Sequence, residues 1–132
     1  MSDVVLDASA TVTALVERTN EAHELRERLG RLGRHSPHLI DAEVGSVLRR
    51  RVAAGMLPAE LAEGALRALD TLVVQRYPHG PPAPAAWRLR HNLSYYDALY
   101  VALAARLRAP LLTADKRLAN APGLPCEVEL IS

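Results

Sequence analysis

The sequence predicts an α/β fold in which a mostly parallel sheet of about four to five strands is flanked by helices. Short aliphatic runs, each of a length typical of one buried strand, occur at 4–6, 72–74, 111–113 and 127–131. Helical patterns separate these runs, so each connection crosses over the sheet and neighbouring strands run parallel. The 132 residues, of which 49% are apolar, suffice for one hydrophobic core and predict a single domain over 1–132.

The first part of the chain is expected to form one strand and two helices. β-branched residues at 4–6 are typical of a buried strand, and a helix is expected at 10–16. The charged segment 20–32 carries alanine and leucine at helical spacing, which gives this helix one apolar face. Gly33 stands where the residue directly after a helix is expected, and 36–37 is interpreted as a break in the pattern.

Two more helices and a second strand are expected next. Residues 39–54 and 59–69 carry apolar residues at the helical period. Gly55 is expected to end the first of these helices, and Pro58 stands in the first turn of the second. The aliphatic run at 72–74 is expected to be the second strand of the sheet.

The remaining third of the chain alternates loops, helices and strands. Four of the nine prolines lie in 77–84, which is expected to be a loop. The helix expected at 95–107 has almost no polar face and is therefore predicted to be buried, with Tyr100 in the core. The other expected elements are two helical segments, a strand and a last edge strand, at 85–90, 116–121, 111–113 and 127–131 respectively.

Four acidic residues stand where such a fold gathers functional groups. Asp7 and Asp115 follow strands, and Glu43 and Asp97 lie near the starts of helices. Parallel sheets bind ligands at the carboxyl ends of their strands. Each acid also has a purely structural interpretation, because it can cap a helix, take part in a capping box after Ser94 or oppose a helix dipole.

Taken together, the four acids predict a metal site. Carboxylates that cluster without cations repel each other, and a divalent cation relieves that repulsion. Mg²⁺ and Mn²⁺ prefer oxygen ligands, and in such sites they promote the cleavage of phosphodiester bonds. We therefore expect an Mg²⁺ site, with Mn²⁺ as the alternative, formed by Asp7, Glu43, Asp97 and Asp115.

Composition limits the other interpretations. The net charge of +1 excludes nucleic-acid binding by bulk charge, so contacts to a nucleic acid would come from local groups such as Lys116 and Arg117. The arginine run at 49–51 could contact phosphates but is interpreted as a solvated helix face. Arg88 and Arg90, before Asp97, could also reach a substrate, and Trp87 is interpreted as an anchor of the proline loop and not as a platform for a base. The single cysteine, Cys126, cannot form an internal disulfide, and no apolar run is long enough for a membrane span. A cytoplasmic protein is expected.

Four sequence blocks resemble the motif blocks of PIN domains, and most of all those of VapC-type toxins from bacterial toxin–antitoxin pairs. The blocks are VVLDASA at 4–10, PHLIDAE at 37–43, YDALYVALA at 96–104 and LLTADKRL at 111–118. The resemblance covers nearly the whole chain, with the blocks in the family's order. It implies a three-layer PIN-like fold and a Mg²⁺-dependent endoribonuclease, often a homodimer, that a cognate antitoxin neutralises.

The resemblance also assigns roles to residues. It implies that Asp7, Glu43 and Asp97 are the central metal ligands and catalytic acids, and that Asp115 contacts the metal directly or through water. Ser9 and Thr113 match positions that support the site by hydrogen bonds. A further acid, Asp41, lies about 200° around the helix from Glu43, so Glu43 is taken as the ligand and Asp41 as a cap.

Two other functions remain open at this stage. The segment 7–11 resembles the first motif of haloacid-dehalogenase-like phosphatases, but that motif has an acid where this chain has Ser9. A phosphatase would release phosphate from small esters, which a nuclease would not. The other alternative is a PIN-like scaffold that binds a partner without cutting RNA, against which the complete set of four acids argues.

Overall fold

A computed structural model describes residues 2–131 and contains one five-stranded sheet. The strand order is β3-β2-β1-β4-β5, and every neighbouring pair is parallel. The strands are β1 Asp3–Leu6, β2 Gly33–Pro37, β3 Gln75–Tyr77, β4 Leu111–Thr113 and β5 Val128–Leu130. This confirms the predicted α/β fold with its parallel sheet, and β5 lies at the sheet edge as expected.

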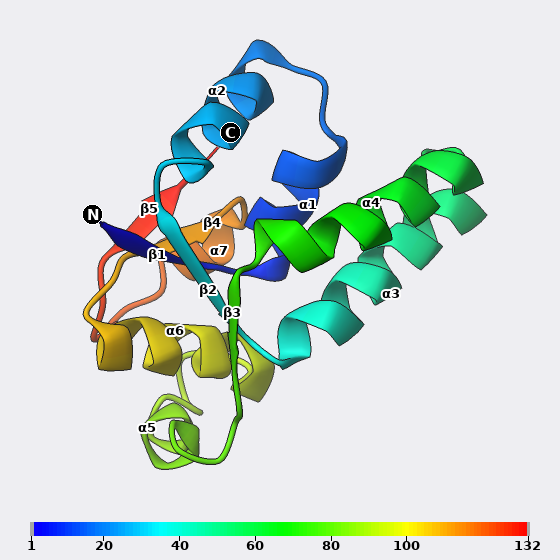
Figure 1. Cartoon of the computed structure of the whole chain (residues 1–132). Helices are drawn as coiled ribbons and strands as arrows, with labels where there is room; N and C mark the ends of the chain where they lie inside the picture. Colours follow the sequence, from blue (N-terminus) through cyan, green and yellow to red (C-terminus); the bar gives the residue numbers. More distant parts are fainter. Residues whose placement is uncertain (1, 132) are drawn as a thin grey trace.

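Helices lie on both sides of the sheet (Figure 1). In that view α5 and α6 lie below the sheet and α1 and α2 above it, while α3 and α4 extend together to the right. The helices are α1 Ala8–Val16, α2 Asn20–Leu29, α3 Leu39–Ala53, α4 Ala59–Leu72, α5 Ala83–Arg88, α6 Tyr95–Leu107 and α7 Lys116–Ala119. Within residues 2–131 the structure contains no helix with the length and apolarity that a membrane span requires.

The prediction was most accurate for α6. Its bounds are the predicted ones, and seven consecutive residues, 98–104, are buried. Ser94 begins the helix, because its hydroxyl accepts a hydrogen bond from the backbone N–H of Asp97. Gly55 adopts a φ of 73° just after α3, which a residue with a side chain rarely does, so it ends that helix as predicted.

Strand β2 was not predicted from the sequence, and its neighbour β3 was predicted at the wrong residues. β2 contains glycine, arginine, histidine, serine and proline, and its polar side chains find partners only in the folded chain. The buried Ser36 hydroxyl, for example, donates to the backbone carbonyl of Leu6 at 2.7 Å. Gly33 therefore belongs to a strand, and Gly30 is the residue that caps α2.

The run at 72–74 marks burial and not a strand. Leu72 is the last residue of α4, and Val73 is fully buried in the core. Val74 is 60% exposed, and the strand that pairs with β2 begins only at Gln75. Hydrophobicity alone does not distinguish the end of a buried helix from a short strand.

The sheet brings the segments that follow its central strands to one edge. β1 lies between β2 and β4, so the residues after Leu6, Pro37 and Thr113 emerge side by side. Asp7 follows β1 directly, and Asp115 follows β4 by two residues. This edge is where the candidate site lies.

Candidate active site

Asp7 is the most firmly held acid of the site. It caps α1, because its Oδ1 accepts a hydrogen bond from the Ala10 backbone N–H at 2.8 Å. Ser9 donates its hydroxyl to the same oxygen at 2.7 Å, and Thr113 donates its hydroxyl to Oδ2. Asp7 is only 5% exposed, so its carboxylate is fixed at the bottom of the site.

Ser9 and Thr113 also connect Asp7 to the loop that carries Asp115. The Ser9 Oγ accepts a hydrogen bond from the Ala114 backbone N–H at 2.8 Å, and the Thr113 Oγ1 accepts one from the Asp115 backbone N–H at 3.0 Å. The two hydroxyl oxygens lie 3.2 Å apart. Both residues that were expected to support the site therefore contact an acid of the site and its neighbouring loop.

Glu43 lies on α3 and is held by a residue of α6. The Tyr100 hydroxyl donates a hydrogen bond to the Glu43 Oε1 at 2.7 Å. Tyr100 is 1% exposed, which agrees with the predicted core position, but its link to Glu43 was not predicted. One signal was present in the sequence: Tyr100 lies three residues after Asp97, a spacing that places both on the same face of a helix.

Asp97 and Asp115 combine helix capping with a place in the site. The backbone N–H of Asp97 is bonded to Ser94, the first residue of its capping box. The Asp115 Oδ1 caps α7 by accepting from the backbone N–H groups of Arg117 at 2.9 Å and Leu118 at 3.4 Å. The structural interpretation of Asp115 as a helix cap is thus correct, and Asp97 makes one of the two bonds of the predicted capping box. Neither interaction conflicts with a role in the site.

All four predicted acids line one cleft of about 380 Å³. Ser9 and Tyr100 line it as well. The cleft also includes Arg51, which donates to the Glu17 carboxylate at 3.1 Å. Because Arg51 lies at this cleft, the interpretation of the arginine run as a purely solvated face is wrong for its last member.

Burial makes three of the acids hard to ionise. It raises the pKa of Asp7 and Glu43, and the charge of Asp97 raises both further, although hydrogen bonds from Ala10 and Tyr100 respectively oppose the rise. Burial likewise raises the pKa of Asp97. The charge of Asp115 raises this pKa further, whereas the hydrogen bond with Ser94 and the charge of Arg117 lower it. The mutual repulsion shows that these carboxylates lie within each other's electrostatic reach.

The donor set fits a hard divalent cation that keeps part of its water shell. In the described part of the chain no group of three His, Cys, Asp or Glu side chains is spaced to enclose a metal ion. Mg²⁺ is usually bound through one or two carboxylates together with water and substrate phosphate, and not by a complete protein cage. An open cleft with carboxylate oxygens and raised carboxyl pKa values suits that mode of binding.

Asp41 lies outside this arrangement, and its predicted role as a helix cap is wrong. The residue that begins α3 is His38, which makes no capping bond with its side chain. Asp41 instead forms a two-pronged ion pair with Arg76, with N–O distances of 2.7 and 2.9 Å. The prediction that Asp41 is turned away from the site, unlike Glu43, agrees with the structure.

A family model and a curated protein match nearly the whole chain. Residues 4–124 match the PIN domain. Ribonuclease VapC1 of Mycobacterium tuberculosis is 51% identical over 132 residues, which cover 99% of each chain. Two solved structures are similar in fold. PAE2754 from Pyrobaculum aerophilum has a TM-score of 0.73 at 20% identity and covers 96% of this chain and 83% of its own. VapBC2 from Rickettsia felis, bound to a DNA fragment from their promoter, has a TM-score of 0.70 at 14% identity and covers 98% of each chain.

Proposed function

The chain belongs to the PIN domain family and, within it, to the VapC ribonucleases, and on this premise we propose a Mg²⁺-dependent endoribonuclease that acts as the toxin of a type II toxin–antitoxin pair. The observation that carries the proposal is the single cleft lined by Asp7, Glu43, Asp97 and Asp115. Membership of this family also excludes the phosphatase alternative.

We assign the four acids to metal binding and catalysis, with Mn²⁺ as an alternative ion. Bound there, the ion would activate a water molecule and stabilise the charge that develops on the phosphodiester oxygens. Asp7 supplies a buried, immobile carboxylate, and Glu43 presents one oxygen while Tyr100 holds the other. The fixed orientation of these oxygens lowers the cost of organising the site when ion and substrate bind.

Magnesium-dependent cleavage of RNA tests the proposal. Total RNA is incubated with the protein in Mg²⁺ or in EDTA, and the new RNA ends are sequenced. New ends are expected only in Mg²⁺, and Asp97→Asn is expected to slow cleavage by about 100-fold or more. Asp41→Asn is the matched control, since Asp41 is an exposed acid that pairs with Arg76 outside the cleft. Cleavage in EDTA, or by Asp97→Asn at the parent rate, would contradict the assignment.

We further propose that a cognate antitoxin neutralises the protein and that the free chain forms a homodimer in the cytoplasm. The name of the Rickettsia felis VapBC2 structure supports an antitoxin for this chain by family. Exposed apolar side chains on and between α3 and α4 support a protein partner; they are Met56, Leu61 and Leu66. Light scattering of the purified chain should give twice the mass of one chain, and a monomer at all concentrations would count against the dimer.

A further inference from the structure

A second groove begins where the acid cleft ends. Its volume is about 810 Å³, and it shares Asp97 and Asp115 with the acid cleft. One wall is the loop that leads into α6, and the other is α7 with the segment after it. We call it the basic groove; its lining residues are 90–94, 97, 115–118 and 120–122. A hydrogen bond of 3.3 Å from the Asn92 side chain to the Pro122 carbonyl joins the two walls.

The charges of the basic groove favour an anion. Apart from the two acids shared with the cleft, its charged side chains are those of Arg90, Lys116 and Arg117. In residues 2–131 none of these three forms a salt bridge, whereas Arg28 and Arg76 are each paired with a carboxylate. The groove therefore carries three cations whose charge no neighbouring carboxylate neutralises by direct contact.

Arg90 is held in position by Trp87. Its Nη1 donates to the Trp87 backbone carbonyl at 3.0 Å, and its Cζ lies 4.9 Å from the centre of the indole ring. A guanidinium has five N–H donors in a rigid plane, so this contact leaves other donors available for a ligand. Trp87 itself is 59% exposed, and its interpretation as an anchor of the loop does not account for this exposure.

We propose that the basic groove binds the single-stranded RNA segment next to the cleaved bond, with Arg90 contacting a backbone phosphate and Trp87 acting as the residue that positions Arg90. This inference rests on the proposed ribonuclease function. It follows from continuity, because an RNA strand whose phosphate lies between Asp97 and Asp115 continues into the groove that these two residues also line.

A single strand fits this place better than a duplex. The cleft is recessed, with Asp7 almost fully buried at its bottom, so the RNA backbone must bend inwards to bring a phosphate to the acids. An unpaired strand can bend in this way and can stack its bases on aromatic rings or guanidinium planes, such as the Trp87–Arg90 pair offers. A duplex keeps its bases paired and its backbone stiff.

Binding is measured apart from cleavage in an Asp7→Asn background. Asp7 is outside the basic groove, and its replacement is expected to stop cutting in Mg²⁺. The probe is an end-labelled single-stranded RNA oligonucleotide of mixed sequence, and anisotropy gives its Kd over a series of salt concentrations. Adding Arg90→Ala should weaken binding about tenfold. It should also make the slope of log K against log salt less negative by about 0.7, the value for one phosphate contact on a single strand.

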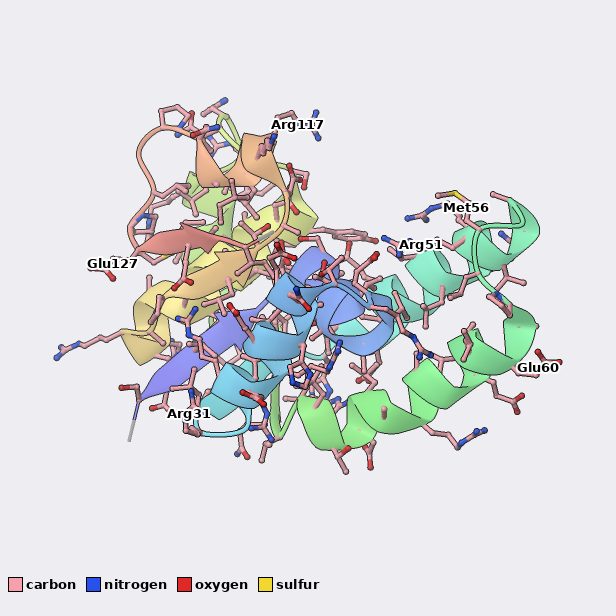
Figure 2. All side chains as sticks on the ribbon, turned by 90° about the horizontal axis from the view of Figure 1, so that it is seen from above. Arg31, Arg51, Met56, Glu60, Arg117 and Glu127 are labelled. Carbon is pink, nitrogen blue, oxygen red and sulfur yellow. The ribbon has the colours of Figure 1, made fainter. Side chains whose placement is uncertain are left out.

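Two further variants separate charge from position. Trp87→Ala keeps the Arg90 charge but frees its side chain, so it should weaken binding, and Trp87→Phe should restore part of the loss. Arg31→Ala is the matched control, because Arg31 is exposed and lies on the side of the molecule opposite Arg117 in Figure 2. In the cutting-competent parent, Arg90→Ala should raise KM and leave kcat nearly unchanged.

The outcomes separate this inference from the proposed function. If Arg90→Ala binds RNA as well as its background, if Arg31→Ala loses as much affinity, or if a duplex of the same sequence binds equally well, the inference is wrong. If Asp7→Asn still cuts RNA at the parent rate, the proposed acid site is wrong, and a shortened probe on a gel shows this directly. Circular dichroism of each variant confirms that it is folded before binding is compared.

Discussion

Replacing Tyr100 with phenylalanine removes a single hydroxyl from the core and should destabilise the protein at neutral pH. That hydroxyl donates to the Glu43 carboxylate at 2.7 Å, a distance typical of a charge-assisted hydrogen bond. Such bonds contribute about 1.5–3 kcal/mol, and we expect the lower part of that range because Glu43 is only partly buried. For a chain of this length, the loss corresponds to a fall in Tm of roughly 5–8 °C.

The pH dependence follows from the sign of the interaction. Tyr100 stabilises the charged form of Glu43 and so lowers the pKa of that carboxyl against the effect of burial. The stabilisation is therefore present above the Glu43 pKa and is lost as the pH falls through it. Thermal unfolding in EDTA, followed by circular dichroism, should show a clear difference between parent and Tyr100→Phe at neutral pH and a smaller one near about pH 4.

A second measurement connects Tyr100 to the proposed metal site. Loss of a partner that orients a metal ligand typically lowers metal affinity about 10- to 100-fold. Mg²⁺ should therefore raise the Tm of Tyr100→Phe less than that of the parent at the same concentration. Tyr96→Phe is the control, because it makes the same chemical change on the same helix at a residue that is 57% exposed. Equal loss of stability at both pH values, or none at neutral pH, would refute the argument.

Three further predictions concern charge and backbone strain. Without metal, Asp7→Asn should unfold at a higher temperature than the parent at neutral pH. Burial and the Asp97 charge raise the pKa of Asp7, so its charged form destabilises the fold, and asparagine can still cap the helix. A lower Tm for Asp7→Asn would contradict this. The stability of the metal-free parent, measured by urea unfolding, should fall as the pH rises through the raised pKa values of Asp7, Glu43 and Asp97. Mg²⁺ should make this fall smaller. A stability that rises with pH would overturn the prediction. Arg108→Gly should stabilise the protein by about 0.5–1 kcal/mol, because Arg108 ends α6 with a strained φ of 54° that glycine adopts freely. Unchanged stability in urea would count against backbone strain at Arg108.

The sequence predicted best those elements whose pattern is local. Helix α6 is apolar on all sides and begins at a serine cap, so both its place and its burial could be inferred. Strand β2 could not, because its polar side chains are satisfied by atoms far away in the chain. His35 is a clear case: its ring nitrogens are hydrogen-bonded to the Tyr77 hydroxyl, 42 residues further on, and to the Asp3 carboxylate, 32 residues earlier.

The candidate site shows the same division. The four acids stood out because each follows a strand or lies near the start of a helix, and because four motif blocks occur in the family's order. The bond between Tyr100 and Glu43 joins residues 57 positions apart. The spacing of Tyr100 from Asp97 places both on one helix face, but no local pattern identifies Glu43 as the partner of Tyr100. The contact between Arg90 and Trp87 is local, but an isolated arginine and tryptophan three residues apart do not indicate whether a groove lies beside them.

Helix capping and metal binding are compatible because a carboxylate has about four positions at which it can accept a bond. Asp7 receives three hydrogen bonds, from two hydroxyls and one backbone N–H, which leaves about one position and no freedom to turn. The two capping bonds of Asp115 both fall on Oδ1 and leave Oδ2 without a capping bond. Glu43 receives one bond and is the most adjustable of the three in the described part of the chain. The caps thus orient the oxygens that remain. In the metal site that we propose, Asp7 would be the fixed carboxylate, and Glu43 would be the one that adapts to the ion and to the position of the substrate.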